Sequence, residues 1–314
     1  MTTTSFPLLK LPLIPLELII EQLDFLDLMQ ISMKSTKLKR LLELLKLSVQ
    51  SLKFFITERF YGIWIERNHE TSQIDACDSV PVDTVTELVN IQGEPVHAWM
   101  DDGGEMKVKS DLSKLATLET ITKHVLSISK VTNYALTYDD VKMEITSLFI
   151  WQITTQMAQL NTFGLVTISP EDLAFILDGI SIERIFLHVS CPGFKYRRPI
   201  RHSGIYIRDP HWVDFDQFSL GPETITAQFS DQKVSNVVLN RLIKDWTEGL
   251  NPKLREVQFT WTGDDPESLA MQLKGLNINH RMTRWSGPQF VYYEVRLSVE
   301  EEMSLNGIHL EDEA

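Results

Sequence analysis

Segments with the apolar spacing of helices alternate with short strand-like runs over much of the chain, and this alternation most constrains the fold. Helices are predicted over Leu112–Ser129, Lys142–Leu160, Pro170–Gly179 and Val234–Trp246, and strands over Tyr134–Tyr138, Phe163–Ile168, Ile185–Val189, Thr224–Phe229 and Leu254–Trp261. Ser169 is a cap for the helix that opens at Pro170. The units recur every 20 to 40 residues or so, roughly the range of known structural repeats. They favour an irregular α/β solenoid of the leucine-rich-repeat kind, in which each unit buries its apolar face against its neighbours. An open, doubly wound α/β sheet gives the same alternation and is the alternative.

The first forty-odd residues predict three short amphipathic helices. Pro15 suits the first turn of a helix, Asp24 is a cap for the second, and Thr36 can cap the third. A unit of about forty residues buries too little surface to be stable alone, so we expect it to lean on the rest of the chain. From Ser48 the apolar period changes to two, which predicts strands and a hairpin through Glu58–Gly62.

Charge and cysteine content exclude several classes of protein. The 314 residues carry a formal net charge of −13, which argues against general attraction to nucleic acid or an anionic membrane. The N-terminal apolar run Leu11–Leu16 is broken by Pro12 and Pro15 and is far shorter than a membrane span, and no signal peptide is recognised. Two cysteines cannot build a disulfide framework, which favours the cytoplasm, the nucleus or both.

Charge is also distributed unevenly along the chain. The first 68 residues hold nine basic and seven acidic side chains, so the remainder carries −15. This change coincides with the polar stretch Arg67–Asp83, which we interpret as a linker or long loop. The last residues, 301–314, are predicted to form a solvated acidic tail.

The N-terminal segment resembles an F-box. The resemblance lies in the run FPLLKLPLIPLELIIEQLDFLDLMQISMKSTKLKRLL, which covers residues 6–42 and has a Leu-Pro pair, an apolar turn and a Ser-x-x-Ser pattern at F-box positions. It is most similar to the large nematode-type families that carry an F-box-associated domain of type 2. The resemblance implies that a Skp-family adaptor docks on Leu11, Pro12, Leu16, Leu28, Ile31 and Ser35.

A second stretch resembles the F-box-associated domain itself. The helix pattern of residues 239–246, followed by Gly249 and Pro252, is similar to the most characteristic part of that domain, as are Gly275-Leu276 and Arg281. The implied organisation is an F-box over residues 5–48, a hairpin and linker over 49–83, an F-box-associated α/β domain over 84–300, and the acidic tail.

No pattern of catalytic residues is found. Gly103-Gly104 is a turn and not a phosphate loop, and Ser203 lacks the setting of a nucleophile. His188, Cys191, His202 and His211 are candidate metal ligands by residue type, but their spacing matches no zinc pattern. We therefore expect a chain without catalytic activity, metal or cofactor.

One basic segment stands out in this acidic chain. It contains Lys195, Arg197, Arg198 and Arg201, together with Tyr196. Arginines favour bidentate recognition of carboxylates, so the segment is a candidate for binding a target protein. The alternative is a solvated loop whose charges neutralise acidic neighbours. The tryptophans Trp212, Trp246, Trp261 and Trp285 are interpreted as core or half-buried anchors.

The resemblance implies a substrate-recognition subunit of a cullin-RING ubiquitin ligase of the SCF type, which bridges a Skp-family adaptor to a target protein. A non-catalytic scaffold that binds proteins without ubiquitin transfer is the second hypothesis. An enzyme is the third, and no motif supports it.

Overall fold

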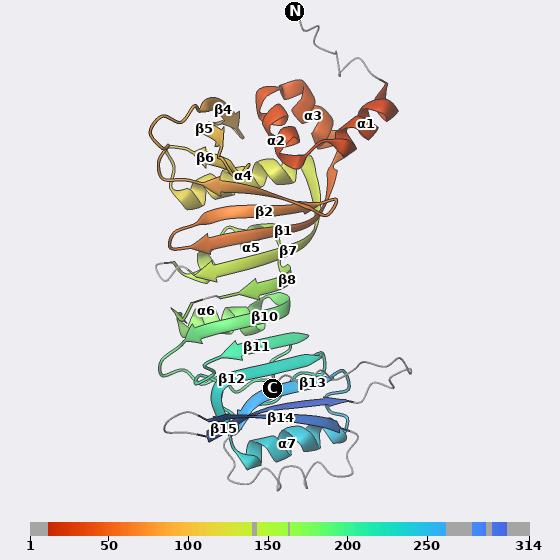
Figure 1. The fold of residues 1–314 in the computed structure, drawn as a ribbon, viewed down its shortest axis with the longest axis vertical. Coiled ribbons are helices and arrows are strands. Elements are labelled where there is room, and N and C mark those ends of the chain that lie inside the picture. Colours follow the sequence, from red (N-terminus) through yellow and green to blue (C-terminus); the bar gives the residue numbers. More distant parts are fainter. Residues whose placement is uncertain (1–11, 140–142, 163, 262–277, 287–290, 300–314) are drawn as a thin grey trace, which may run out of the picture. The chain divides into compact units, whose positions relative to one another are not determined.

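A computed structural model describes residues 12–139, 143–162, 164–261, 278–286 and 291–299. The chain divides into two compact units, Met1–Phe163 and Gly164–Ala314. The described part is a mixed α/β structure with seven α-helices (Figure 1). Leu11 and the tail residues 301–314 lie outside the described residues. Within those residues, no helix combines the length and the apolar character that a membrane crossing needs.

The first unit begins with three helices and continues as a mixed sheet. Its helices are α1 (Leu13–Gln22), α2 (Phe25–Lys34), α3 (Thr36–Leu45), α4 (Lys114–Ile128) and α5 (Ile150–Ile153). Its strands are β1 (Leu47–Thr57), β2 (Tyr61–Arg67), β3 (Glu70–Ala76), β4 (Glu87–Ile91), β5 (Glu94–Met100), β6 (Met106–Lys109), β7 (Ser129–Asp139) and β8 (Gln156–Asn161). Within this unit the strand order is β8-β7-β1-β2-β3-β6-β5-β4. The neighbours β1 and β7, β7 and β8, and β3 and β6 are parallel, and the other pairs are antiparallel.

One face of this sheet packs against α4 (Figure 1). Alternate residues of β1 and β2 are fully buried, among them Leu52, Phe54 and Ile63. Leu118 and Ile121 of α4 are buried as well. The period of two that the sequence shows after Ser48 therefore reflects a sheet with one buried face, and the predicted hairpin is confirmed by the pairing of Ile56 with Tyr61.

Three polar contacts tie the N-terminal helices to the rest of the first unit. The buried Arg67 guanidinium of β2 donates to the carbonyl oxygens of Leu23 at 2.8 Å and Glu21 at 3.1 Å, at the C-terminal end of α1. Lys46, which ends α3 in a left-handed conformation, donates to the Ser127 carbonyl at the end of α4 at 2.7 Å. Cations at helix C-termini satisfy the last carbonyl groups and oppose the helix dipole.

The third contact is buried and joins α2 to α4. The Ser32 hydroxyl donates to the Met29 carbonyl at 2.6 Å, so its oxygen accepts from His124 Nε2, 2.8 Å away. His124 is therefore the neutral tautomer that carries its proton on Nε2. The expectation that the small helical segment leans on the rest of the chain is confirmed.

The second unit contains a row of parallel strands. Its strands are β9 (Val166–Thr167), β10 (Ser181–Ser190), β11 (Gly204–Arg208), β12 (Thr226–Val234), β13 (Glu256–Trp261), β14 (Ile278–Ser286) and β15 (Val291–Val299). Its helices are α6 (Pro170–Ala174), which continues as a π-helical turn over Phe175–Gly179, and α7 (Asn236–Thr247). Within this unit the order is β10-β11-β12-β13-β15-β14, in which β10 to β13 are parallel and β9 pairs with β10.

The parallel strands align their buried residues in columns. Leu187, Ile207, Phe229 and Phe259 face one another across successive strands, and all four are buried. The register steps between them are 20, 22 and 30 residues. These steps lie in the predicted range, and each strand pairs with the one that follows it, as in a stack of repeated units.

Two predicted elements are wrong. The helix predicted over Lys142–Leu160 is replaced by a 3-10 turn (Ile145–Ser147), the four-residue α5 and strand β8. Apolar residues three apart, such as Met157 and Leu160, fit a helix equally well, and pairing of β8 with β7 decides the outcome. The linker predicted over Arg67–Asp83 contains β3, whose buried positions include the polar Ser72 and Asp75 and therefore give no apolar period.

Smaller differences concern helix ends and a short strand. The third helix is capped by Ser35 and not by Thr36, because the Ser35 hydroxyl accepts from the Leu38 amide at 3.3 Å. Asp24 and Ser169 cap their helices as predicted. The strand predicted over Phe163–Ile168 is limited to β9, and Phe163 lies outside the described residues.

Candidate partner-binding surfaces

The six residues assigned to the adaptor by resemblance lie in different environments. Pro12 is exposed, Ile31 is half-buried, and Leu11 lies outside the described residues. Leu16 and Leu28 are buried in the first unit, Leu28 with only 1% of its surface exposed. These two leucines hold the helices together in this structure and offer almost no surface to a partner. Ser35 caps α3, so its hydroxyl is already engaged.

Other apolar side chains of the same helices face solvent. Leu18 and Ile19 on α1 are 58% and 37% exposed, and Leu44 on α3 is 83% exposed. Leu44 follows the buried Leu42 by two positions, which turns it away from the apolar face of α3. Leu18 and Leu44 were not predicted as contact candidates, because the resemblance assigns the contact to other residues of these helices. Exposed apolar side chains such as these are available for contact with a protein partner.

The basic segment of the second unit is held by ion pairs and backbone contacts. Arg197 Nε lies 2.9 Å from Asp214 Oδ2, and Arg198 Nη1 lies 3.1 Å from Asp178 Oδ2. Lys195 donates to the His211 carbonyl at 2.6 Å. Within the described residues, Arg201 alone of the four cations has neither a hydrogen bond nor an ion pair. Two of the four positive charges that stand out in the sequence are therefore neutralised by acidic neighbours, which agrees in part with the solvated-loop alternative.

A buried tyrosine anchors the same segment. The Tyr196 hydroxyl donates to Asp178 Oδ1 at 2.8 Å, and Tyr196 forms a parallel bridge to Val213. Burial, reinforced by the hydrogen bond to Asp178, raises the pKa of Tyr196 above its usual value. Asp178 thus accepts from Tyr196 with one oxygen and from Arg198 with the other. The segment is a fixed part of the second unit, so the side chains of Arg198 and Arg201 would be presented at defined positions.

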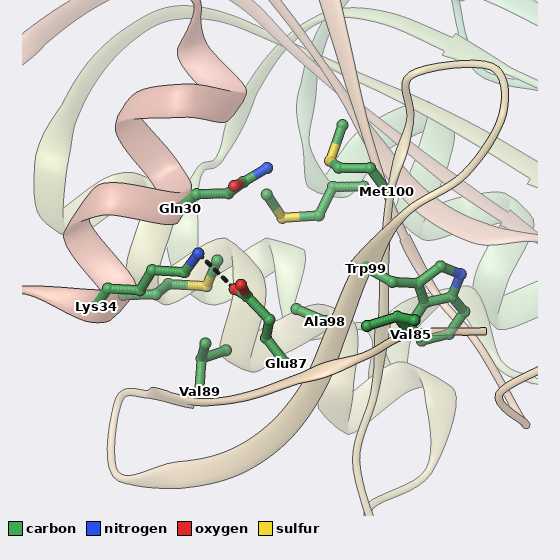
Figure 2. A pocket seen from close by; sticks show the side chains of 10 residues that line it. Gln30, Lys34, Val85, Glu87, Val89, Ala98, Trp99 and Met100 are labelled. Carbon is green, nitrogen blue, oxygen red and sulfur yellow. Dashed lines mark ion pairs between the residues drawn. The ribbon is translucent and has the colours of Figure 1, made fainter. Parts of the chain in front are cut away.

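A cavity of about 200 Å³ lies between α2 and the strands β4 to β6 (Figure 2). Its apolar lining includes Met33 of α2, Val89 of β4, Ala98 and Trp99 of β5, and Met106 of β6. The ion pair between Lys34 Nζ and Glu87 Oε2, at 2.5 Å, connects α2 to β4. No sequence pattern pointed to this cavity, because its lining comes from four separate elements.

A charged cluster centres on Lys107 of β6. Its ammonium group lies 2.5 Å from Asp75 Oδ2, 2.5 Å from Glu105 Oε2 and 3.0 Å from Asp101 Oδ2. Burial raises the pKa of Asp75, although hydrogen bonds from Lys107 and Gln73 act against this shift. The acidic turn at Asp101 is thus held by an ion pair to Lys107.

The four candidate metal ligands of the sequence do not form a site in the described part of the structure. Among the described residues, no group of three or more histidine, cysteine or acidic side chains is arranged to hold a metal ion. The buried His202 donates through Nδ1 to the Ile182 carbonyl, 2.8 Å away, when it carries its proton there. Cys191 is buried, and burial raises the pKa of its thiol.

The tryptophans whose side chains are described serve as anchors. Trp212 is fully buried and Trp246 is half-buried, as predicted. The side chains of Trp261 and Trp285 lie outside the described part of the structure.

Three comparisons with known proteins give no relationship on which to build. Neither protein-family models, nor curated proteins, nor solved structures yield a match to this chain. The functional assignment therefore depends on the surfaces above and on the F-box-like residues of the sequence.

Proposed function

We propose that the chain is a substrate-recognition subunit of an SCF-type ubiquitin ligase, in which the N-terminal helices bind a Skp-family adaptor and the second unit captures the target. The observation that carries the proposal is the exposed apolar surface of α1 and α3, in a segment whose sequence resembles an F-box. Catalysis belongs to other subunits, and this chain raises the local concentration of the target near the charged conjugating enzyme. A scaffold that binds proteins without ubiquitin transfer is the second candidate, because the same surfaces suit it.

The structure revises which residues the adaptor would contact. Leu16 and Leu28 are buried in the first unit, so the proposed contact keeps Pro12 and uses Leu18, Ile19 and Leu44 in place of the two buried leucines. Removing such side chains from water is favourable at about 25 cal/mol per Å². The anchoring of α1 by Arg67 and of α2 by His124 keeps these helices in place before any partner arrives. Preorganisation of this kind lowers the cost of binding.

Replacing Leu18 with glutamate, or Leu44 with glutamate, is expected to weaken binding of a purified Skp-family adaptor at least tenfold, which is about 1.4 kcal/mol. Both side chains are exposed, so the folded state should not be affected. The measurement is adaptor affinity by calorimetry, with melting temperatures to verify folding. Val237→Glu on α7 is the matched control, because Val237 is an exposed apolar residue in the second unit.

An absence of adaptor binding by the unmodified chain would contradict the proposal and favour the scaffold. The same holds if both glutamate variants bind as well as the Val237→Glu control. Binding that is lost in the glutamate variants but kept in the control would separate an adaptor surface from a general effect of added negative charge.

Target capture is expected to depend on the basic segment through Arg201, the cation of that segment that has no hydrogen bond or ion pair among the described residues. Arg201→Glu should change the proteins that are labelled by proximity, and the affected partners should show a salt-sensitive association. Arg59→Glu is the matched control, since Arg59 is an exposed arginine of the β1–β2 turn in the first unit. Identical labelling by both variants would mean that the segment only connects β10 to β11.

A further inference from the structure

Strand β4 is an open edge of the sheet in the first unit. It pairs with β5 and with no other strand of the described residues. An edge strand presents backbone N–H and C=O groups that an additional strand can use, and natural edges are commonly protected by lysine, proline or a bulge. Here the residues that face outward from the strand include Leu88, 69% exposed, and the preceding loop contains the exposed Val82 and Val85.

The turn after β4 determines which backbone groups face the open edge. Gln92 and Gly93 both have positive φ angles, of 54° and 95°, and they connect the paired residues Ile91 and Glu94. In a two-residue hairpin of this type the closing pair exchanges both ladder hydrogen bonds, and the bonded pairs then alternate. Leu88 and Asn90 are therefore the residues whose N–H and C=O groups point away from β5. Pro95 lies opposite Asn90, at a non-bonded position where no N–H is needed.

The cavity between α2 and β4 lies on the inner side of this edge. Val89 and Glu87 alternate with the outward-facing Leu88, and both line the cavity together with Met33 and Lys34 of α2 (Figure 2). A volume of about 200 Å³ is below the ~300 to 1,000 Å³ of a typical small-molecule site. It suits one large apolar side chain, and methionines in the lining can adapt to its shape.

The charge around the edge restricts the partner. Residues 82–94 carry three acidic side chains, Asp83, Glu87 and Glu94, and no lysine or arginine. The only cation that lines the cavity is Lys34, and Glu87 already neutralises it. The edge therefore attracts a positively charged segment and disfavours an acidic one.

We infer that the β4 edge and the adjoining cavity bind an extended, basic peptide segment of a partner protein. The segment would add a strand beside β4, bond to Leu88 and Asn90, and insert one large apolar side chain between α2 and β4. Strand addition obtains affinity from main-chain hydrogen bonds and specificity from pockets for alternate side chains. The inference is independent of the proposed function, because neither the adaptor surface nor the basic segment contributes to it.

The test uses the full chain and a fluorescein-labelled peptide of eight residues. The peptide alternates threonine and valine, has leucine at the fourth position and ends in lysine on both sides. We expect a dissociation constant of about 100 μM or tighter by fluorescence anisotropy. Substituting the leucine with alanine, or replacing the lysines with glutamates, should each weaken binding at least tenfold.

Three variants of the protein separate the edge from the cavity. Leu88→Pro removes an N–H group that faces the open edge without removing a ladder bond to β5, and it should weaken binding at least tenfold. Leu88→Thr removes the same side chain but keeps the N–H group, and it should bind within twofold of the unmodified chain. Ala98→Leu fills the cavity from β5, and it should abolish the advantage of the leucine peptide over the alanine peptide.

A peptide methylated at alternate backbone nitrogens provides the same test without altering the protein, in case Leu88→Pro does not fold. The inference is overturned if the leucine peptide does not bind at 1 mM, or if the backbone-methylated peptide and Ala98→Leu both leave affinity unchanged. It is also overturned if sedimentation shows a dimer that Leu88→Pro converts to monomer, because a second copy of the chain would then occupy the edge.

Discussion

Lys107→Met is expected to destabilise the protein by about 3–5 kcal/mol at pH 7, the usual cost of leaving a buried charge without its partner. Asp75 is 4% exposed, and Lys107 is its only cationic partner among the described residues. Gln73 also donates to Asp75, at 3.1 Å, but one amide cannot neutralise a carboxylate. Urea unfolding of the variant and of the unmodified chain measures the difference.

A matched control and a rescue make this prediction specific. Lys53→Met removes a lysine from the exposed pair Lys53–Glu66, whose atoms are 3.8 Å apart, and should cost at most about 1 kcal/mol. Asp75→Asn in the Lys107→Met background removes the unpaired charge and should recover much of the stability. Equal losses in Lys53→Met and Lys107→Met would mean that the buried pair contributes no more than the exposed one. No recovery in the double variant would mean that the unpaired charge of Asp75 does not cause the loss.

The second large effect is a loss of stability in acid caused by His124. Burial, and to a smaller degree the charge of Lys39, lowers the pKa of His124 from 6.5 to about 4. The unfolded chain therefore binds a proton at this residue between pH 6.5 and pH 4 while the folded chain does not. The contribution of His124 to the free energy of unfolding is fully present above pH 6.5, the pKa of the histidine in the unfolded chain. It decreases as the pH falls, by about 2 kcal/mol between pH 7 and pH 5 and by about 3 kcal/mol in total.

His124→Phe should remove this contribution, because phenylalanine has a similar volume and does not titrate. The Ser32 hydroxyl keeps its bond to the Met29 carbonyl in that variant. The quantity to measure is the difference between the unfolding free energies at pH 7 and pH 5, compared between the two proteins so that the contributions of other groups cancel. An equal pH dependence in both would show that His124 is accessible to protons in the folded state.

The sequence was most informative for elements whose structure is decided by local capping or by a single buried face. Ser169 before Pro170 predicted the start of α6, and the apolar residues around Leu118 predicted α4, because local capping and one buried face suffice for these helices. The parallel strands β10, β12 and β13 were predicted for a similar reason, because each has a short apolar core, such as Ile185 and Leu187 in β10. The short strand β11 was not predicted.

The sequence was least informative where distant residues decide the structure. β3 was predicted to be a linker because the polar residues Asp75 and Ser72 occupy its buried positions. Their neighbours, Lys107 and strand β2, come close to them only when the sheet forms. The N-terminal helices were predicted to be amphipathic, but the burial of Leu28 and the exposure of Leu44 depend on how these helices pack against the rest of the first unit. The charges of the basic segment likewise could not be paired with Asp178 and Asp214 from sequence alone.

The parallel pairing of β1 with β7 has a consequence for how the protein is made. Leu47 pairs with Ser129, and 82 positions separate them in the chain. A ribosome adds about 5–20 residues per second, so β1 waits roughly 4–16 s for its neighbour and for α4. During that interval Leu52 and Phe54 would emerge on a hairpin with one open edge and an uncovered apolar face. We therefore expect the yield of folded protein to depend on chaperones that hold nascent chains, and on the speed at which residues 58–139 are translated.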